Sequence, residues 1–182
     1  MIGPVILDSN ILVDHFNGIE QARDELKYHR DAVISAVTWM ELMTAFEAKL
    51  LAGVLSEADY AAAKSVLSLF PVVHINDAIM EETARVRGQS LFIKKKLALP
   101  DAIIQASAIV TTRILVTRNI KDFDMYASNV RVPYLAEITS RSKPPTVSLF
   151  TPVSELAVVI TCLLYTSPSP RDQRGSRMPS SA

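Results

Sequence analysis

A short apolar run near the start of the chain, Val5-Ile6-Leu7, ends directly in a carboxylate, Asp8. Apolar residues at successive positions are typical of a strand that is covered on both faces, as in a parallel sheet. Two small polar residues and a helical segment follow, which is the order expected of a strand–helix unit. Ligands of open α/β sheets bind outside the carboxyl ends of the strands. Asp8 is therefore predicted to lie where the chemistry of such a fold takes place.

Later segments repeat this alternation of strand and helix. The other predicted strands are residues 32–34, 72–75 and 114–117, with a short edge strand at 130–133, where a proline is tolerated. The predicted helices are residues 11–16, 19–29, 39–52, 56–69, 77–92 and 101–110. Strands that alternate with helices predict an α/β fold with a central parallel sheet of four to five strands and right-handed crossovers.

Polar residues suited to cap a helix precede three of these segments. Thr38 and Asn76 are each predicted to cap the helix that directly follows them. Ser56 and Asp59 have the spacing of a capping box in which Asp takes the last position. These caps set the predicted starts of the helices.

The composition limits the class of protein. The chain has 182 residues, 49% of them hydrophobic, and a formal net charge of zero, so any contact with nucleic acid must be local. A single cysteine, Cys162, excludes an internal disulfide framework and a cysteine-rich zinc site. The longest uncharged apolar stretch, residues 156–165, is shorter than the roughly 20 residues that span a bilayer. No signal-peptide pattern precedes the first strand, so we expect a cytoplasmic protein without a membrane anchor.

The alternating pattern ends near residue 134. We predict one catalytic domain over residues 1–135 and a poorly defined C-terminal extension over 136–164. Residues 165–182 are rich in Ser, Pro and Arg and are predicted to be disordered. Residues 162–172 also resemble the translated sequencing-adapter tail of some assembled reading frames, so this tail is interpreted as non-native and excluded from functional reasoning.

Four acidic residues occupy comparable places around the predicted sheet. Asp8 follows the first strand, although Asp is also a common helix N-cap. Glu41 lies on a helix face of small residues, typical of a cleft wall or close packing, although a solvated glutamate is the ordinary alternative. Asp101 begins a helix that is otherwise apolar, which places it at the rim of the core, although a first-turn Asp also favours the helix dipole. Asp122 lies in the loop after the fourth strand, where turns are rich in Asp in any case.

Taken together, these residues put carboxylates near one edge of the sheet. The sequence offers no nucleophilic Ser or Cys motif and no glycine-rich phosphate loop beside them. Clustered carboxylates suit hard cations such as Mg²⁺ and Mn²⁺, because oxygen ligands fit these ions and the ions relieve the mutual repulsion. Two such ions about 4 Å apart could activate water and stabilise the leaving oxygen in phosphodiester cleavage.

Four segments, in this order, resemble the PIN-domain nucleases, and among them the VapC-type toxins of type II toxin–antitoxin modules. The segments are residues 6–10, 34–42, 99–108 and 115–123, within a match that covers residues 2 to about 134. The resemblance implies a three-layer fold with the parallel sheet at its centre. It also implies an endoribonuclease dependent on Mg²⁺ or Mn²⁺, usually a homodimer, that a small antitoxin protein holds inactive.

The resemblance assigns roles to particular residues. Asp8 and Asp101 would be the principal metal ligands, with Glu41 as a supporting acid. The family often has Asp at the position of Asn119, so here a neutral ligand stands in its place and Asp122 becomes the remaining acid. One charge fewer implies that a second metal ion is held weakly. The supporting polar residues would be Ser9, Asn10 and Thr117.

A basic segment leads up to Asp101. Its members are Arg85, Arg87, Lys94, Lys95 and Lys96. A solvated basic helix end is the ordinary interpretation of such a run, but this is the one obvious place in the sequence for RNA phosphates to dock.

Two other functions stay open at this point. The first is a non-catalytic partner- or RNA-binding module on the same fold, in which the change at Asn119 has left a degenerate metal site. The second is a phosphatase-like domain with Asp8 as nucleophile, which is disfavoured because Asn10 stands where that mechanism needs a second Asp.

Overall fold

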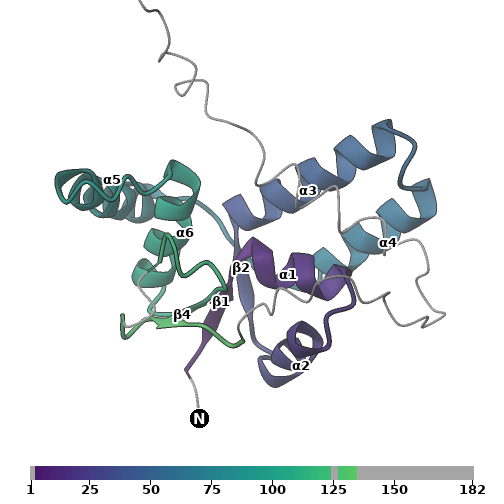
Figure 1. Ribbon diagram of the computed structural model, residues 1–182, viewed down its shortest axis with the longest axis horizontal. Coiled ribbons are helices and arrows are strands. Elements are labelled where there is room, and N and C mark those ends of the chain that lie inside the picture. Colours follow the sequence, from purple (N-terminus) through teal and green to yellow (C-terminus); the bar gives the residue numbers. More distant parts are fainter. Residues whose placement is uncertain (1–2, 124–126, 135–182) are drawn as a thin grey trace, which may run out of the picture.

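Five short parallel strands form one central sheet in the order β3-β2-β1-β4-β5. The structure is a computed structural model that describes residues 3–123 and 127–134 (Figure 1). The strands are β1 (Val5–Leu7), β2 (Val33–Ser35), β3 (Val72–Val73), β4 (Ile114–Val116) and β5 (Val130–Arg131). The α/β class and the parallel sheet are confirmed, including the short edge strand that ends before the proline.

Helices cover both faces of this sheet. They are α1 (Ser9–Phe16), α2 (Glu20–Tyr28), α3 (Ala36–Leu51), α4 (Glu57–Leu67), α5 (Asp77–Phe92) and α6 (Leu99–Val110). In Figure 1, α1 to α4 lie on one side of the strands, and α5 and α6 lie together on the other. The three-layer arrangement is confirmed.

The apolar side chains of β1 pack into the core on both faces of the sheet. Val5 and Leu7 belong to the core cluster on the side of α1 and α3, whereas Ile6 belongs to the cluster that includes Ile104 of α6. All three strand residues are at most 1% exposed. Full burial of such a side chain contributes roughly 1.5–3 kcal/mol, which explains why a central strand of this sheet has no polar face.

One predicted cap was wrong. The helix α3 begins at Ala36 rather than after Thr38, and Ser35 caps it by accepting a hydrogen bond from the Thr38 backbone N–H at 2.9 Å. Thr38 lies inside the helix, where its hydroxyl contacts Ser35 and donates to the Leu7 carbonyl at 3.4 Å. The predicted start was late because Ser35 and Thr38 are both suited to cap a helix, and it is the Ser35 hydroxyl that accepts from a backbone N–H of the first turn.

The other caps agree with the prediction. Ser56 accepts a hydrogen bond from the backbone N–H of Asp59 at 3.1 Å, and Asn76 accepts one from Ile79 at 3.0 Å. The helix α4 ends at Leu67, two residues before its predicted end.

The predicted extension, residues 136–164, and the predicted tail, residues 165–182, lie outside the described residues, as does Cys162. Across the part of the chain that the structure describes, no helix has the length and apolarity to cross a bilayer.

Candidate active site

The ends of two neighbouring strands, β1 and β4, define the candidate site. Asp8 follows β1 and Thr117 follows β4, and the two residues are 4% and 0% exposed. The backbone N–H of Asp8 donates to the Val116 carbonyl at 3.0 Å, so the hydrogen-bond ladder of the sheet continues to the acid itself. The sheet therefore fixes the position of the Asp8 backbone.

The Asp8 carboxylate accepts hydrogen bonds from all three predicted supporting residues. The backbone N–H of Ser9 donates to Oδ1 at 2.7 Å and its hydroxyl lies 3.3 Å from the same oxygen. The Asn10 amide donates to Oδ2 at 2.7 Å, and the Thr117 hydroxyl donates to Oδ2 at 2.6 Å. Asp8 also caps α1, so the N-cap role and the site role coexist in one side chain.

Burial dominates the titration of this acid. It raises the pKa of Asp8 above its ordinary value, and the bonds from Thr117, Ser9 and Asn10 lower it only in part. The site therefore contains a carboxylate whose orientation is fixed and whose negative charge is poorly solvated.

Asn10 links the two strand ends. Its amide nitrogen donates to both Asp8 and the Thr117 hydroxyl, the latter at 3.0 Å, and its amide oxygen accepts from the Arg118 backbone N–H at 3.1 Å. An aspartate here could not donate to Asp8 and would add a second charge beside it. The neutral amide, which counted against a phosphatase mechanism, thus has a structural role.

The three other predicted acids come from different elements and act on one another. Burial first, and then the charges of Asp8, Asp122 and Glu41, raise the pKa of Asp101 in α6 to about 7. Burial and the charge of Asp8 also raise the pKa of Glu41 in α3, against the opposing effect of the Ser9 hydroxyl. Asp8, Glu41 and Asp122 therefore all lie within electrostatic range of Asp101.

Asn119 and Asp122 form a turn of their own. The Asn119 amide donates to the Asp122 carboxylate at 2.8 Å, and its oxygen lies 3.3 Å from the Asp122 backbone nitrogen that donates to it. The Asn119 backbone N–H donates to the Thr117 hydroxyl at 2.9 Å. The structure thus brings Asn119 next to Asp122 and Thr117, with its amide oxygen already accepting a hydrogen bond.

The donor set has the chemistry of a hard-cation site without a closed ligand sphere. Across residues 3–123 and 127–134, no three side chains of His, Cys, Asp or Glu are gathered tightly enough to hold a metal ion. The available donors are nevertheless carboxylate oxygens, and their mutual repulsion is the property that a divalent cation relieves. The residues present fit a divalent cation in kind and in charge.

The predicted RNA-binding residues are dispersed. Lys94, Lys95 and Lys96 are exposed in the turn between α5 and α6, which precedes the helix that carries Asp101. Arg85 donates to Glu82 at 2.8 Å and is therefore engaged within α5. Arg87 is partly buried, and its Nε has no hydrogen-bond partner.

The prediction missed a second polar network beside the site. Asp14 of α1 is buried and accepts hydrogen bonds from the Arg118 guanidinium at 2.7 Å and from the Tyr134 hydroxyl at 2.9 Å. The available signal was the spacing of Asp14 and Asn10, which places both residues on one face of α1.

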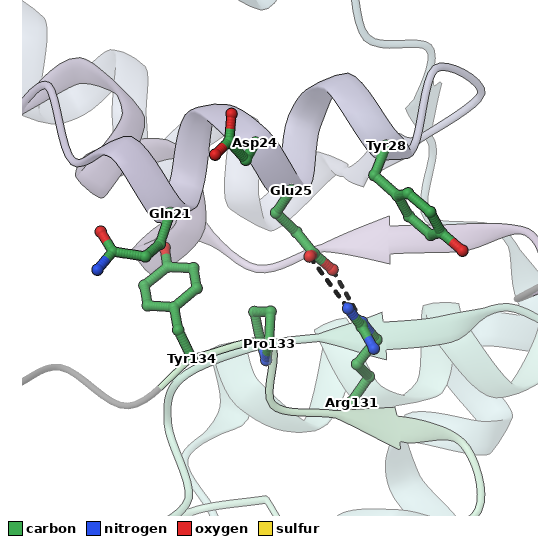
Figure 2. Close-up of a pocket in the computed structure, with 7 residues that line it drawn as sticks. All are labelled: Gln21, Asp24, Glu25, Tyr28, Arg131, Pro133 and Tyr134. Atoms are coloured by element: carbon green, nitrogen blue, oxygen red, sulfur yellow. Dashed lines mark hydrogen bonds and ion pairs between the residues drawn. The ribbon is translucent and has the colours of Figure 1, made fainter.

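A separate pocket of about 410 Å³ lies between α2 and the end of β5 (Figure 2). Arg131 donates to the Glu25 carboxylate inside it at 2.8 and 3.1 Å, and Tyr28 and Tyr134 are among the lining residues. None of the four site acids lines this pocket.

Comparisons with known proteins show what this chain is similar to. The family model of the PIN domain matches residues 5–128. A solved toxin–antitoxin complex from Klebsiella pneumoniae contains a chain that is 32% identical, with a TM-score of 0.60 and coverage of 72% of this chain and 98% of that one. A comparison with curated proteins finds no match.

More distant structures share the fold. FitAcB from Neisseria gonorrhoeae is 21% identical, with a TM-score of 0.60 and coverage of 71% of this chain and 97% of that one. DNA-bound VapBC from Salmonella typhimurium is 22% identical, with a TM-score of 0.61 and coverage of 72% and 96%. The described residues therefore have the same arrangement of sheet and helices as these proteins.

Proposed function

This chain belongs to the PIN-domain family, and we propose that it is a metal-dependent endoribonuclease, the toxin of a toxin–antitoxin module. One observation carries the proposal. The charges of Asp8, Asp122 and Glu41, three acids from different parts of the fold, all add to the effect of burial in raising the pKa of Asp101. Carboxylates brought together in this way favour a divalent cation, because its charge compensates their repulsion.

The proposed cofactor is Mg²⁺ or Mn²⁺, with Asp8 and Asp101 as principal ligands and Glu41 and Asp122 as further acids. When bound, such an ion supplies Lewis-acid activation of water for phosphodiester hydrolysis. The chain's own residues prepare the site. Thr117 and its neighbours orient Asp8, and we assign Asn119 to the orientation of Asp122, because its amide already donates to that carboxylate.

The proposed substrate is RNA, approached from the turn between α5 and α6. Lys94, Lys95 and Lys96 are exposed there, and the turn leads into the helix that carries Asp101. Because the chain has no net charge, this local cluster must supply the attraction for phosphates. We expect the enzyme to act on RNA in the cytoplasm.

The proposed protein partners are an antitoxin and a second copy of the chain. The similar chain from Klebsiella pneumoniae was solved as a toxin–antitoxin complex, which supports the first. A largely apolar groove between α5 and α6, lined by Met80, Leu91 and Leu99, supports the second, because about half of each of these side chains is exposed.

The test is an RNA cleavage assay with full-length protein freed of any co-purifying partner. Structured and single-stranded RNA would be incubated in Mg²⁺ or Mn²⁺, with EDTA as the metal-free control. The test variant is Asp8→Asn/Asp101→Asn, and the matched control is Asp24→Asn, which removes an exposed acid that pairs with Lys27 on α2. Cleavage that requires metal and is lost in the double variant supports the proposal. Folded protein that cleaves no RNA, or cleavage that persists in the double variant, contradicts it.

A non-catalytic binding module is the second candidate, and a specific observation favours it. The Asn119 oxygen is engaged in a turn, and the described acids are not gathered into a closed ligand sphere. Under this alternative, Asp8→Asn leaves binding of the partner protein almost unchanged, and no RNA is cut by either form. An aspartyl-phosphate on Asp8, detected by mass spectrometry, would instead favour the phosphatase mechanism.

A further inference from the structure

We propose that Arg118 is a positioning residue. Together with Asp14 and Tyr134 it forms a set of contacts, here called the lock, that holds the loop 117–122 in place beside the site carboxylates. The lock spans three regions of the chain: α1, the loop after β4 and the segment after β5. Its effect on metal binding rests on the proposed function, whereas the loop's position does not depend on it.

The contacts centre on the carboxylate of Asp14, whose side chain is only 11% exposed. Arg118 Nη2 donates to Asp14 Oδ1 at 2.7 Å, and Arg118 Nε faces Oδ2 in the same ion pair. The Tyr134 hydroxyl donates to Oδ2 at 2.9 Å, and its ring lies 5.8 Å from the Arg118 guanidinium carbon. Asp14 therefore accepts from two partners that also contact each other, an arrangement that fixes one orientation of the arginine.

The backbone of Arg118 connects this lock to the site. Its N–H donates to the Asn10 oxygen, and Asn10 in turn donates to Asp8. Thr117, which precedes Arg118, donates to Asp8, and Asn119, which follows it, donates to Asp122. Arg118 thus stands between the two residues that orient the site carboxylates, while its own side chain points to a third carboxylate in α1.

The far end of this loop is also fixed. Phe123 is 1% exposed and belongs to the core cluster that contains Ile104 and Leu115. The loop is therefore anchored by an ion pair at Arg118 and by an aromatic ring at Phe123. Loss of the first anchor leaves Asn119 and Asp122 held mainly by local hydrogen bonds.

An arginine beside a nuclease site could instead bind a substrate phosphate. The geometry favours the positioning role, because the Arg118 side chain is only 21% exposed and its charge is compensated by a buried carboxylate. A phosphate contact would require this ion pair to break and would leave the buried Asp14 carboxylate with no cationic partner, which is unfavourable.

The test compares amide hydrogen exchange by NMR and Mn²⁺ binding in the full-length chain. The variants are Arg118→Met, Arg118→Lys, Asp14→Asn and the milder Tyr134→Phe, which keeps the ring. The matched control is Arg113→Met, which removes an arginine at the opposite end of β4. Thermal denaturation identifies any variant in which the whole fold, and not only the loop, is destabilised.

We expect the backbone amides of residues 118 and 119 to exchange at least tenfold faster in Arg118→Met and in Asp14→Asn. In the double variant Arg118→Met/Asp14→Asn they should exchange no faster than in either single variant. Arg118→Lys should recover part of the protection, and the β2 amides should be unchanged in all variants. Unchanged exchange at these amides, or additive effects in the double variant, would overturn the lock.

The two proposals fail in different ways. If the wild-type chain binds no Mn²⁺, the metal-dependent function fails while the exchange data still decide the lock. If Mn²⁺ binds to the wild type and equally well to Arg118→Met, the connection from the lock to the site fails, because a displaced loop should weaken binding about 10- to 100-fold.

Discussion

At the scale of single residues, Asp8 shows how one carboxylate can be both structural and functional. It caps α1 and accepts from Ser9, Asn10 and Thr117, yet burial still raises its pKa. A group with this many donors would have a low pKa at an exposed site. The remaining excess of negative charge at the edge of the sheet is consistent with a site that needs a cation to complete it.

Asp101→Asn should stabilise the metal-free protein. The pKa of Asp101 is raised to about 7 from its ordinary value of 3.8, so between these two pH values the folded state keeps a proton that the unfolded state has lost. The stability of the folded state therefore falls as the pH rises from 3.8 to about 7. Removing the acid should therefore recover about 1–2 kcal/mol near neutral pH, or a few degrees in Tm.

The measurement is thermal denaturation in EDTA at about pH 5 and about pH 8, with Asp24→Asn as the control. The gain in Tm should be larger at the higher pH. A variant that is no more stable than the wild type at the higher pH would show that burial and the neighbouring acids do not destabilise the ionised Asp101 carboxylate.

At the scale of secondary-structure elements, the start of α3 depends on a buried cap. Ser35 is 0% exposed, and its hydroxyl accepts from the Thr38 backbone N–H and contacts the Thr38 hydroxyl. Ser35→Ala should cost at least about 1 kcal/mol of unfolding free energy, because it leaves a buried donor without an acceptor. Chemical denaturation measures this cost. Ser56→Ala, at the exposed cap of α4, provides the comparison, and an equal or larger cost there would contradict the account.

The ion pair between α2 and β5 should make stability depend on pH in the acidic range. Burial alone would raise the pKa of Glu25, but the hydrogen bonds and charge of Arg131, together with His29, lower it below the ordinary 4.5. A lowered carboxyl pKa gives stability that is fully present above about pH 4.5 and is lost as the pH falls through the folded-state value.

We therefore expect Tm to fall less between pH 6 and about pH 3.5 in Glu25→Gln than in the wild type, although the variant is less stable at pH 6. Thermal scans across this range provide the comparison, and Glu20→Gln, at the start of the same helix, is the control. If Tm falls equally in Glu25→Gln and in the wild type as the pH is lowered, the ion pair with Arg131 does not shift the pKa of Glu25.

At the scale of the whole molecule, the sequence predicts the layers well because burial leaves a clear pattern. The strands β1, β2 and β4 are apolar at successive positions since both faces are covered, and this pattern identifies a parallel sheet. Asp8 and Asp122 then follow the ends of β1 and β4, whereas Glu41 and Asp101 are carried by the helices α3 and α6. The start of α3 was misplaced because Ser35 and Thr38 carry the same kind of capping side chain, and local sequence does not distinguish them.

The sequence could not predict the polar contacts that join distant segments. Arg118 and Asp14 are 104 positions apart, and Tyr134 and Asp14 are 120 apart. No local periodicity encodes such pairs, because each partner alone is an ordinary polar residue of a helix or loop. For the same reason, the sequence did not predict the hydrogen bond from Asn10 to Thr117, which joins the ends of β1 and β4.

The central claim is that the acidic edge of the sheet is a metal site. Titration of full-length protein with Mn²⁺, followed by electron paramagnetic resonance, measures binding independently of any RNA substrate. We predict one tightly held ion per chain, a second held weakly because Asn119 is neutral, and loss of the tight ion in Asp8→Asn/Asp101→Asn. Absence of bound Mn²⁺ in the wild type, or binding that the double substitution leaves intact, would contradict the account.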